Sequence, residues 1–142
     1  ADCFICEADL YISDLSIFDA ELSRSCYYGK MVPGFSDDWV FDWDGERITR
    51  VGKEGTDRYN MVGVSYFKKA DAAVIRDAID AAYEKPGYEG LYWDEIVDRQ
   101  LDKLNLDIHP VEKEQIVEID SVAELAVIDE SYREVLEKMQ AE

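Results

Sequence analysis

The feature that most constrains the fold is a buried-strand pattern followed at once by an amphipathic-helix pattern. Residues 61–67 form an apolar run of strand length, and Gly63 within this run permits close approach of neighbouring groups. From Ala70 to Ala82, alanine, valine and isoleucine then recur at spacings of three and four residues, until Pro86-Gly87 ends the pattern. A strand that leads directly into a helix predicts an α/β fold.

The rest of the chain adds a hairpin and further elements of both kinds. Asp44-Gly45 separates two strand-like runs, 39–43 and 46–51, and this dipeptide is a strong signal for a β-hairpin. Ser121 and Glu124 form a capping box that opens a C-terminal helical stretch. Further strands are predicted at 3–6, 24–32, 106–109 and 115–119, and further helices at 13–18, 93–104 and 122–139. Residues 1–142 are therefore predicted to form a single α/β domain, with a mixed sheet flanked by helices and an inserted β-hairpin.

The charge of the chain excludes two classes of partner. With 33 acidic and 15 basic residues, the formal net charge is -18. The resulting field repels the phosphates of nucleic acids and anionic membrane surfaces. No apolar run approaches the roughly 20 residues of a membrane span, so neither nucleic acid nor a membrane is an expected partner. A small phosphorylated substrate would need local Lys, Arg or a metal ion to offset the same repulsion.

The cysteines indicate a reducing compartment. The chain has three, Cys3, Cys6 and Cys26, and neither this odd number nor their spacing suits a disulfide framework. Cys3 and Cys6 are separated by two residues within a predicted strand, so their side chains point to opposite faces and do not form a redox or zinc pair. A cytoplasmic location is the prediction.

Three carboxylates lie near the ends of predicted strands. Asp9 closes the first strand and Asp120 closes the last, while Glu118 and Asp120, being two residues apart, share one face. Ligands of such sheets bind beyond the carboxyl ends of the strands. These residues could converge on Mg²⁺, which prefers a few carboxylates together with substrate phosphates. The alternative is that they are solvated strand ends, with Asp120 merely preceding the helix cap at Ser121.

Aromatic residues beside a carboxylate suggest a second kind of site. If the chain is still extended at Tyr92 and Asp94, both side chains point one way while Trp93 turns into the core. Together with Trp39, they provide the aromatic faces and negative charge that bind a quaternary ammonium group. The alternative is that Asp94 caps a helix, and that Tyr92 and Trp39 are core or cross-strand aromatics.

Several short blocks occur in the order and at the spacing found in a known family. They are 5–10, 22–25, Asp38-Trp39, 63–67, Leu91-Tyr92-Trp93-Asp94 and 116–121. Together they resemble the second half of bacterial choline-phosphate cytidylyltransferases. The resemblance covers nearly the whole chain and thins after Leu125.

This resemblance implies both a fold and an activity. The fold would be the Rossmann-like α/β fold of nucleotide-diphospho-sugar transferases. The activity would be Mg²⁺-dependent transfer of CMP from CTP to phosphocholine, with release of pyrophosphate. By motif position, the resemblance assigns the catalytic Mg²⁺ to Asp9 and Asp120, with Glu118 as a weaker candidate, and the choline group to Trp39, Tyr92 and Asp94.

One part of the family pattern has no counterpart in the chain. The family carries a glycine-rich nucleotide-binding loop, with Arg and Lys, in its N-terminal half, whereas the stretch 52–55 follows a hairpin strand, does not open a helix and is typical of a turn. We therefore expect the acceptor- and metal-binding C-terminal half of a longer enzyme, inactive alone. A free-standing remnant that binds a partner is the alternative. Strand edges left open by the absent N-terminal half favour pairing, so a homodimer is also expected.

Two other functions are compatible with the same residues. A sugar-1-phosphate nucleotidyltransferase would share the fold but would need polar groups for sugar hydroxyls, where this chain offers Trp and Tyr. A non-catalytic binding or oligomerisation module would need no metal at all.

Overall fold

The computed structural model describes residues 1–141 and contains a mixed sheet. Its strands run in the order β1-β4-β3-β5, where the two central strands are antiparallel to each other. β1 is antiparallel to β4 and β5 is parallel to β3, which confirms the predicted mixed sheet. The strands are β1 (Cys3–Cys6), β3 (Cys26–Trp43), β4 (Ile48–Phe67) and β5 (Asp107–Pro110).

The predicted hairpin joins the two longest strands. The backbone N–H of Asp44 donates to the carbonyl of Arg47 (3.2 Å), and the Asp44 carboxylate accepts from the backbone N–H groups of Glu46 and Arg47. Gly45 occupies the left-handed region with φ 98°, which favours glycine. The hairpin at Asp44-Gly45 is therefore confirmed.

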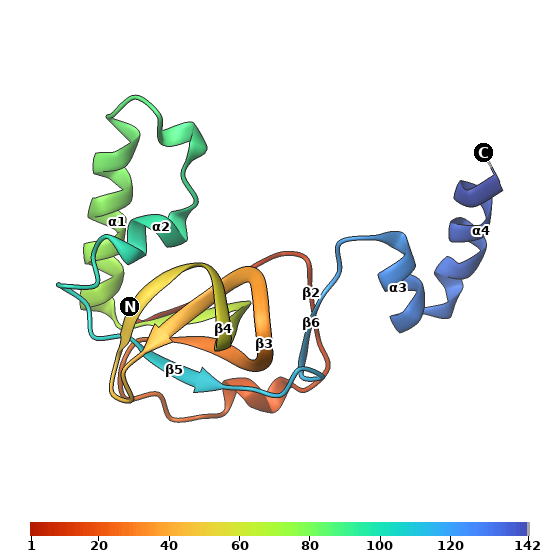
Figure 1. The fold of residues 1–142 in the computed structure, drawn as a ribbon, viewed down its shortest axis with the longest axis horizontal. Helices are drawn as coiled ribbons and strands as arrows, with labels where there is room; N and C mark the ends of the chain where they lie inside the picture. The colour runs from red at the N-terminus through yellow and green to blue at the C-terminus, as the bar shows by residue number, and fades with distance from the viewer. Residues whose placement is uncertain (142) are drawn as a thin grey trace.

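The two long strands also curl back on themselves. Val40 pairs with Gly52 on one side and with Asn60 on the other, and several register shifts interrupt the β3–β4 ladder. Bulges of this kind bend strands and increase their twist. As a result, β3 and β4 roll into the curved body seen at the centre of Figure 1. The sequence pattern predicted separate short strands, whereas the structure joins them into two long bent ones.

Helices α1 (Lys69–Tyr83) and α2 (Trp93–Asp98) pack beside the sheet, with the short 3₁₀ helix η2 (Tyr88–Gly90) between them (Figure 1). Trp93 enters the core as expected, where its ring stacks on Tyr27 with 6.1 Å between centroids. α1 confirms the alanine-rich helix. α2 is shorter than the predicted 93–104 and ends at Asp98, after which the Gln100 N–H donates to the Val97 carbonyl (2.9 Å), a spacing of three residues in place of the four of an α-helix. Leu101 is nevertheless buried, as its apolar spacing predicted.

A small second sheet joins two segments that are far apart in the sequence. β2 (Leu10–Ile12) pairs antiparallel with β6 (Ile116–Glu118), so that Leu10 lies opposite Glu118. The predicted short helix is present as the 3₁₀ helix η1 (Leu15–Phe18), whose N-cap Asp14 accepts a hydrogen bond from the Ser16 amide. This pairing brings residues near position 9 beside residues near position 118.

The last elements form an arm that points away from the sheet (Figure 1). It consists of α3 (Val122–Ile128), the 3₁₀ helix η3 (Glu130–Tyr132) and α4 (Arg133–Ala141). The capping box at Ser121 and Glu124 is confirmed. The single predicted helix 122–139 is broken, because Asp129 leaves the helical conformation and its carboxylate caps Ser131 instead. Within residues 1–141, no helix is both long and apolar enough to cross a membrane.

Candidate functional site

Three carboxylates converge where the small sheet meets the main one. Glu7, Asp9 and Glu118 each place one oxygen so that all three lie within 4.8 Å of one another. Two backbone hydrogen bonds hold the segment that follows β1, from the Glu7 N–H to the Gly63 carbonyl (2.9 Å) and from the Ile119 N–H to the Asp9 carbonyl (2.8 Å). We call these three residues the acidic trio.

Gly63 makes room for the acidic trio. It has φ 81°, and a β-carbon at this position would lie 2.8 Å from a carboxylate oxygen of Glu7 and 3.1 Å from the Leu10 side chain. Only glycine accommodates both the backbone conformation and this contact. The predicted close approach at Gly63 is therefore confirmed, and the approaching groups are the side chains of Glu7 and Leu10.

The carboxylates repel one another electrostatically. Burial raises the pKa of Glu7, and the negative charges of Asp94 and Asp9 raise it further. The pKa of Glu118 is raised by burial first, and then by the charges of Asp120 and Asp9. A cluster of oxygen donors whose ionisation is opposed by like charge fits a hard divalent cation. When bound there, such an ion would neutralise charge on substrate phosphates.

The trio agrees only in part with the predicted metal ligands. Asp9 and Glu118 are brought together as expected, although Asp9 lies in the turn after β1 and not at the strand end. Asp120 lies outside the trio but close enough for its charge to act on Glu118, and its backbone N–H donates to Glu124 (2.7 Å). Glu7 was missed, although its place directly after the first strand is the same signal that pointed to Asp9.

The predicted aromatic residues also meet. Trp39 and Tyr92 stand edge to face, with 5.6 Å between ring centroids. Trp39 comes from β3, and Tyr92 is the N-cap residue of α2. The Lys53 ammonium lies 5.6 Å from the Trp39 centroid and 5.7 Å from that of Tyr92, so the pair already has a cation at its faces. All three residues line a cavity of about 550 Å³ together with Glu95, Asp98 and neighbouring residues.

The Asp94 side chain is buried and does not line the cavity that contains Trp39 and Tyr92. Because α2 already begins at Trp93, Tyr92 and Asp94 are not two positions of one extended strand. The expectation that both side chains point the same way is wrong, since Tyr92 is 59% exposed and Asp94 only 4%. The Tyr27 hydroxyl donates to the Asp94 carboxylate (2.8 Å). Burial raises the pKa of Asp94 to about 6, against the opposing effect of that hydrogen bond.

The stretch 52–55 lies inside β4 and does not open a helix. Glu54 has φ 69°, so the strand bends sharply there. The predicted turn is therefore wrong, because these residues form a bent part of a strand, and the stretch does not have the loop-to-helix form of a phosphate-binding loop.

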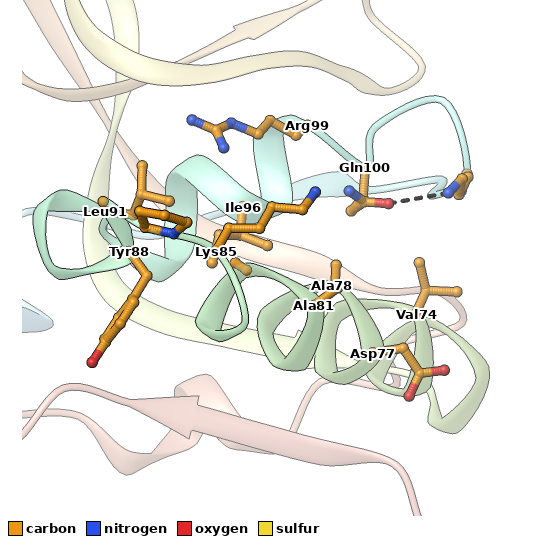
Figure 2. A pocket seen from close by; sticks show the side chains of 14 residues that line it. Val74, Asp77, Ala78, Ala81, Lys85, Tyr88, Leu91, Ile96, Arg99 and Gln100 are labelled. Carbon is orange, nitrogen blue, oxygen red and sulfur yellow. Dashed lines mark hydrogen bonds between the residues drawn. The ribbon is translucent and has the colours of Figure 1, made fainter.

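Another cavity, of about 680 Å³, lies between α1 and the segment that contains η2 and α2 (Figure 2). Ala78 and Ala81 of α1 form part of one wall, Lys85 reaches along the cavity, and Arg99 lies on the opposite side. Asp77 is its one lining carboxylate among the described residues. This cavity therefore lacks the set of ligands that the acidic trio provides.

The fold is shared with solved structures. The structure is similar to the CTP:phosphocholine cytidylyltransferase from Streptococcus pneumoniae, with a TM-score of 0.74, 24% identity and coverage of 92% of this chain and 57% of that one. It is also similar to the nucleoside-diphosphate-sugar pyrophosphorylase from Vibrio cholerae, with a TM-score of 0.60, 16% identity and coverage of 89% and 55%. The chain therefore has the α/β fold of nucleotide-diphospho-sugar transferases.

The curated proteins that the chain resembles in sequence are cytidylyltransferases. The chain is 52% identical over 130 residues to the 2-aminoethylphosphonate cytidylyltransferase of Lancefieldella rimae, covering 91% of this chain and 53% of that protein. It is 26% identical over 131 residues to the choline-phosphate cytidylyltransferase of S. pneumoniae, covering 92% and 57%. No family model matches. The resemblance to bacterial cytidylyltransferases is confirmed, and the chain spans about half the length of the curated relatives it matches.

Proposed function

We propose that the chain is the acceptor- and metal-binding part of a cytidylyltransferase, whose nucleotide is bound by a further half that this sequence does not contain. The observation that carries the proposal is the 52% identity, over 130 residues, to a 2-aminoethylphosphonate cytidylyltransferase. The acidic trio supports it, because nucleotidyl transfer needs charge neutralisation at phosphate oxygens. By this proposal the 142-residue chain is inactive without the nucleotide-binding half.

The reaction requires little covalent chemistry from the protein. A phosphonate or phosphate oxygen of the acceptor attacks the α-phosphorus of CTP, the bond from that phosphorus to the bridging oxygen breaks, and pyrophosphate leaves with the bonding electrons. The acidic trio would hold Mg²⁺ beside these phosphates. The role of this chain is then to position the acceptor in line, which is the main source of rate in such transfers.

The acceptor that we favour carries a primary ammonium group and a phosphonate, as 2-aminoethylphosphonate does. A primary ammonium donates hydrogen bonds, and Glu95 and Asp98 in the aromatic cavity offer carboxylate acceptors. Phosphocholine is the second candidate, because aromatic faces such as those of Trp39 and Tyr92 bind a quaternary ammonium. In the intact enzyme with CTP, we expect kcat/KM to be highest for 2-aminoethylphosphonate, lower for phosphocholine and lowest for glucose 1-phosphate. A preference for the sugar phosphate would contradict the proposal.

Trp39→Ala in the intact enzyme is expected to raise the acceptor KM about three- to thirtyfold, which corresponds to the roughly 0.5 to 2 kcal/mol of a cation–π contact. kcat should change little, because the ring contacts the ammonium end and not the reacting phosphorus. Steady-state kinetics with varied acceptor measure this. Trp43→Ala is the control, since Trp43 packs on Tyr59 and does not line the cavity. A rise in the KM for CTP alone would show that Trp39 serves the nucleotide.

Mg²⁺ is expected to stabilise the 142-residue chain against unfolding. At a concentration about ten times the Kd, binding to the folded state adds about 1.4 kcal/mol, which raises the Tm by about 3 to 6 °C. Thermal unfolding with MgCl₂, or with NaCl at the same ionic strength, measures the shift. Glu7→Gln should abolish it, whereas Glu114→Gln should not, because Glu114 is exposed and lies outside the trio. An equal shift in the Glu7→Gln variant would locate the ion elsewhere.

A further inference from the structure

The cation position between Trp39 and Tyr92 is taken by a residue of the chain itself. Lys53 lies opposite Trp39 in the β3–β4 ladder, so the two side chains are cross-strand neighbours. The Lys53 ammonium is within 6 Å of both ring centroids, the range of a cation–π contact. We propose that Lys53 competes with the acceptor for this position and thereby selects primary over quaternary ammonium acceptors. The inference rests on the proposed function, because it assumes that the acceptor binds in this cavity.

The backbone around Lys53 is held in place. The Arg50 guanidinium donates to the carbonyls of Lys53 (3.2 Å) and Glu54 (2.9 Å), and is itself paired with Asp42 (2.9 Å). Gly52 leaves space for this guanidinium, because a β-carbon there would lie 2.6 Å from an Arg50 nitrogen. The sharp bend at Glu54 therefore presents Lys53 to the rings as a fixed feature of the fold, while only its side chain needs to move.

Selectivity follows from how the two kinds of ammonium are bound. A quaternary ammonium has no N–H to donate, so it needs the aromatic faces and must displace the Lys53 ammonium, because two cations cannot share one position. A primary ammonium donates to carboxylates. Glu95 and Asp98, which line the same cavity, each use one oxygen for a backbone N–H and keep the other for a ligand. The primary ammonium can therefore bind while Lys53 stays in place.

The first test uses tetramethylammonium chloride, a quaternary cation without a phosphate, so that neither nucleotide nor metal is needed. Isothermal titration of the 142-residue chain should show Lys53→Met binding this cation about three- to thirtyfold more tightly than the unsubstituted chain. Lys53→Arg, which keeps a cation, should bind as the unsubstituted chain does. Lys113→Met removes the same charge from a side chain that is 79% exposed, and should also leave binding unchanged. Circular dichroism and thermal unfolding confirm that each variant is folded.

The second test measures acceptor choice in the intact enzyme. Lys53→Met should raise the ratio of kcat/KM for phosphocholine to that for 2-aminoethylphosphonate by a similar factor. Unchanged or weaker tetramethylammonium binding by Lys53→Met would overturn the inference, while the proposed cytidylyl transfer, assayed with 2-aminoethylphosphonate, would stand. Tighter binding with an unchanged ratio would overturn the selective role, and would show that the acceptor binds outside this cavity.

Discussion

Asp9→Asn is expected to lower kcat for cytidylyl transfer in the intact enzyme by about a hundred- to ten-thousandfold, the equivalent of several kcal/mol of metal-based charge stabilisation. Asparagine keeps the size of the side chain but removes the negative charge that would bind the ion. Asp9 lies in the acidic trio, where one of its oxygens is within 4.8 Å of oxygens from Glu7 and Glu118. The loss should therefore appear in kcat at saturating substrates, measured by pyrophosphate release.

Folding should not suffer from this substitution, because removing one carboxylate relieves repulsion on Glu7 and Glu118. A Tm in metal-free buffer at or above that of the unsubstituted chain is expected. Asp19→Asn, at an exposed position after η1, is the matched control and should keep full activity. Asp120→Asn is expected to lower kcat as well, through its charge next to Glu118. Full activity of Asp9→Asn would refute the metal site.

Asp94→Asn is expected to stabilise the chain above pH 7 by about 2 to 3 kcal/mol, because burial raises the pKa of Asp94 from 3.8 to about 6 in the folded chain and each tenfold change in proton affinity corresponds to about 1.36 kcal/mol. The folded chain keeps the proton on this buried carboxyl to higher pH than the unfolded chain does. Between about pH 4 and pH 6 the unfolded state therefore binds fewer protons, and stability falls as the pH rises. Above pH 6 the loss is complete.

Urea unfolding of both chains from pH 4 to pH 8, in the presence of EDTA, measures this difference. The two curves should meet near pH 4, where the carboxyl is protonated in both states, and should separate as the pH approaches 6. Asparagine can still accept the hydrogen bond from Tyr27, so packing is preserved. Asp102→Asn, at an exposed position, should show no pH-dependent difference. Parallel curves for Asp94→Asn and the unsubstituted chain would contradict the pKa shift.

Local signals in the sequence were sufficient to predict most of the helices and strands. Asp-Gly at 44–45 predicted the hairpin, because few residues tolerate the backbone of such a turn. The alanine spacing predicted α1, and Ser121 with Glu124 predicted the start of α3, because both patterns act within a few residues of chain. The ends of α2 and of the C-terminal helix were wrong. The first gives way to hydrogen bonds spaced three residues apart after Asp98, and Asp129 interrupts the second.

For the candidate site, the sequence predicted most of the residues but not how they are arranged. The sequence alone determined that Asp9, Glu118, Trp39 and Tyr92 are available, and motif order suggested which of them belong together. Only the tertiary structure decided that Glu7 completes the acidic trio, that Asp94 turns away from Tyr92, and that Lys53 lies at the aromatic pair. The trio and the Lys53 contact depend on strand pairing between residues far apart in the chain, and the burial of Asp94 depends on the start of α2 at Trp93 and on the hydrogen bond from Tyr27. Neither residue type nor local spacing encodes these long-range contacts.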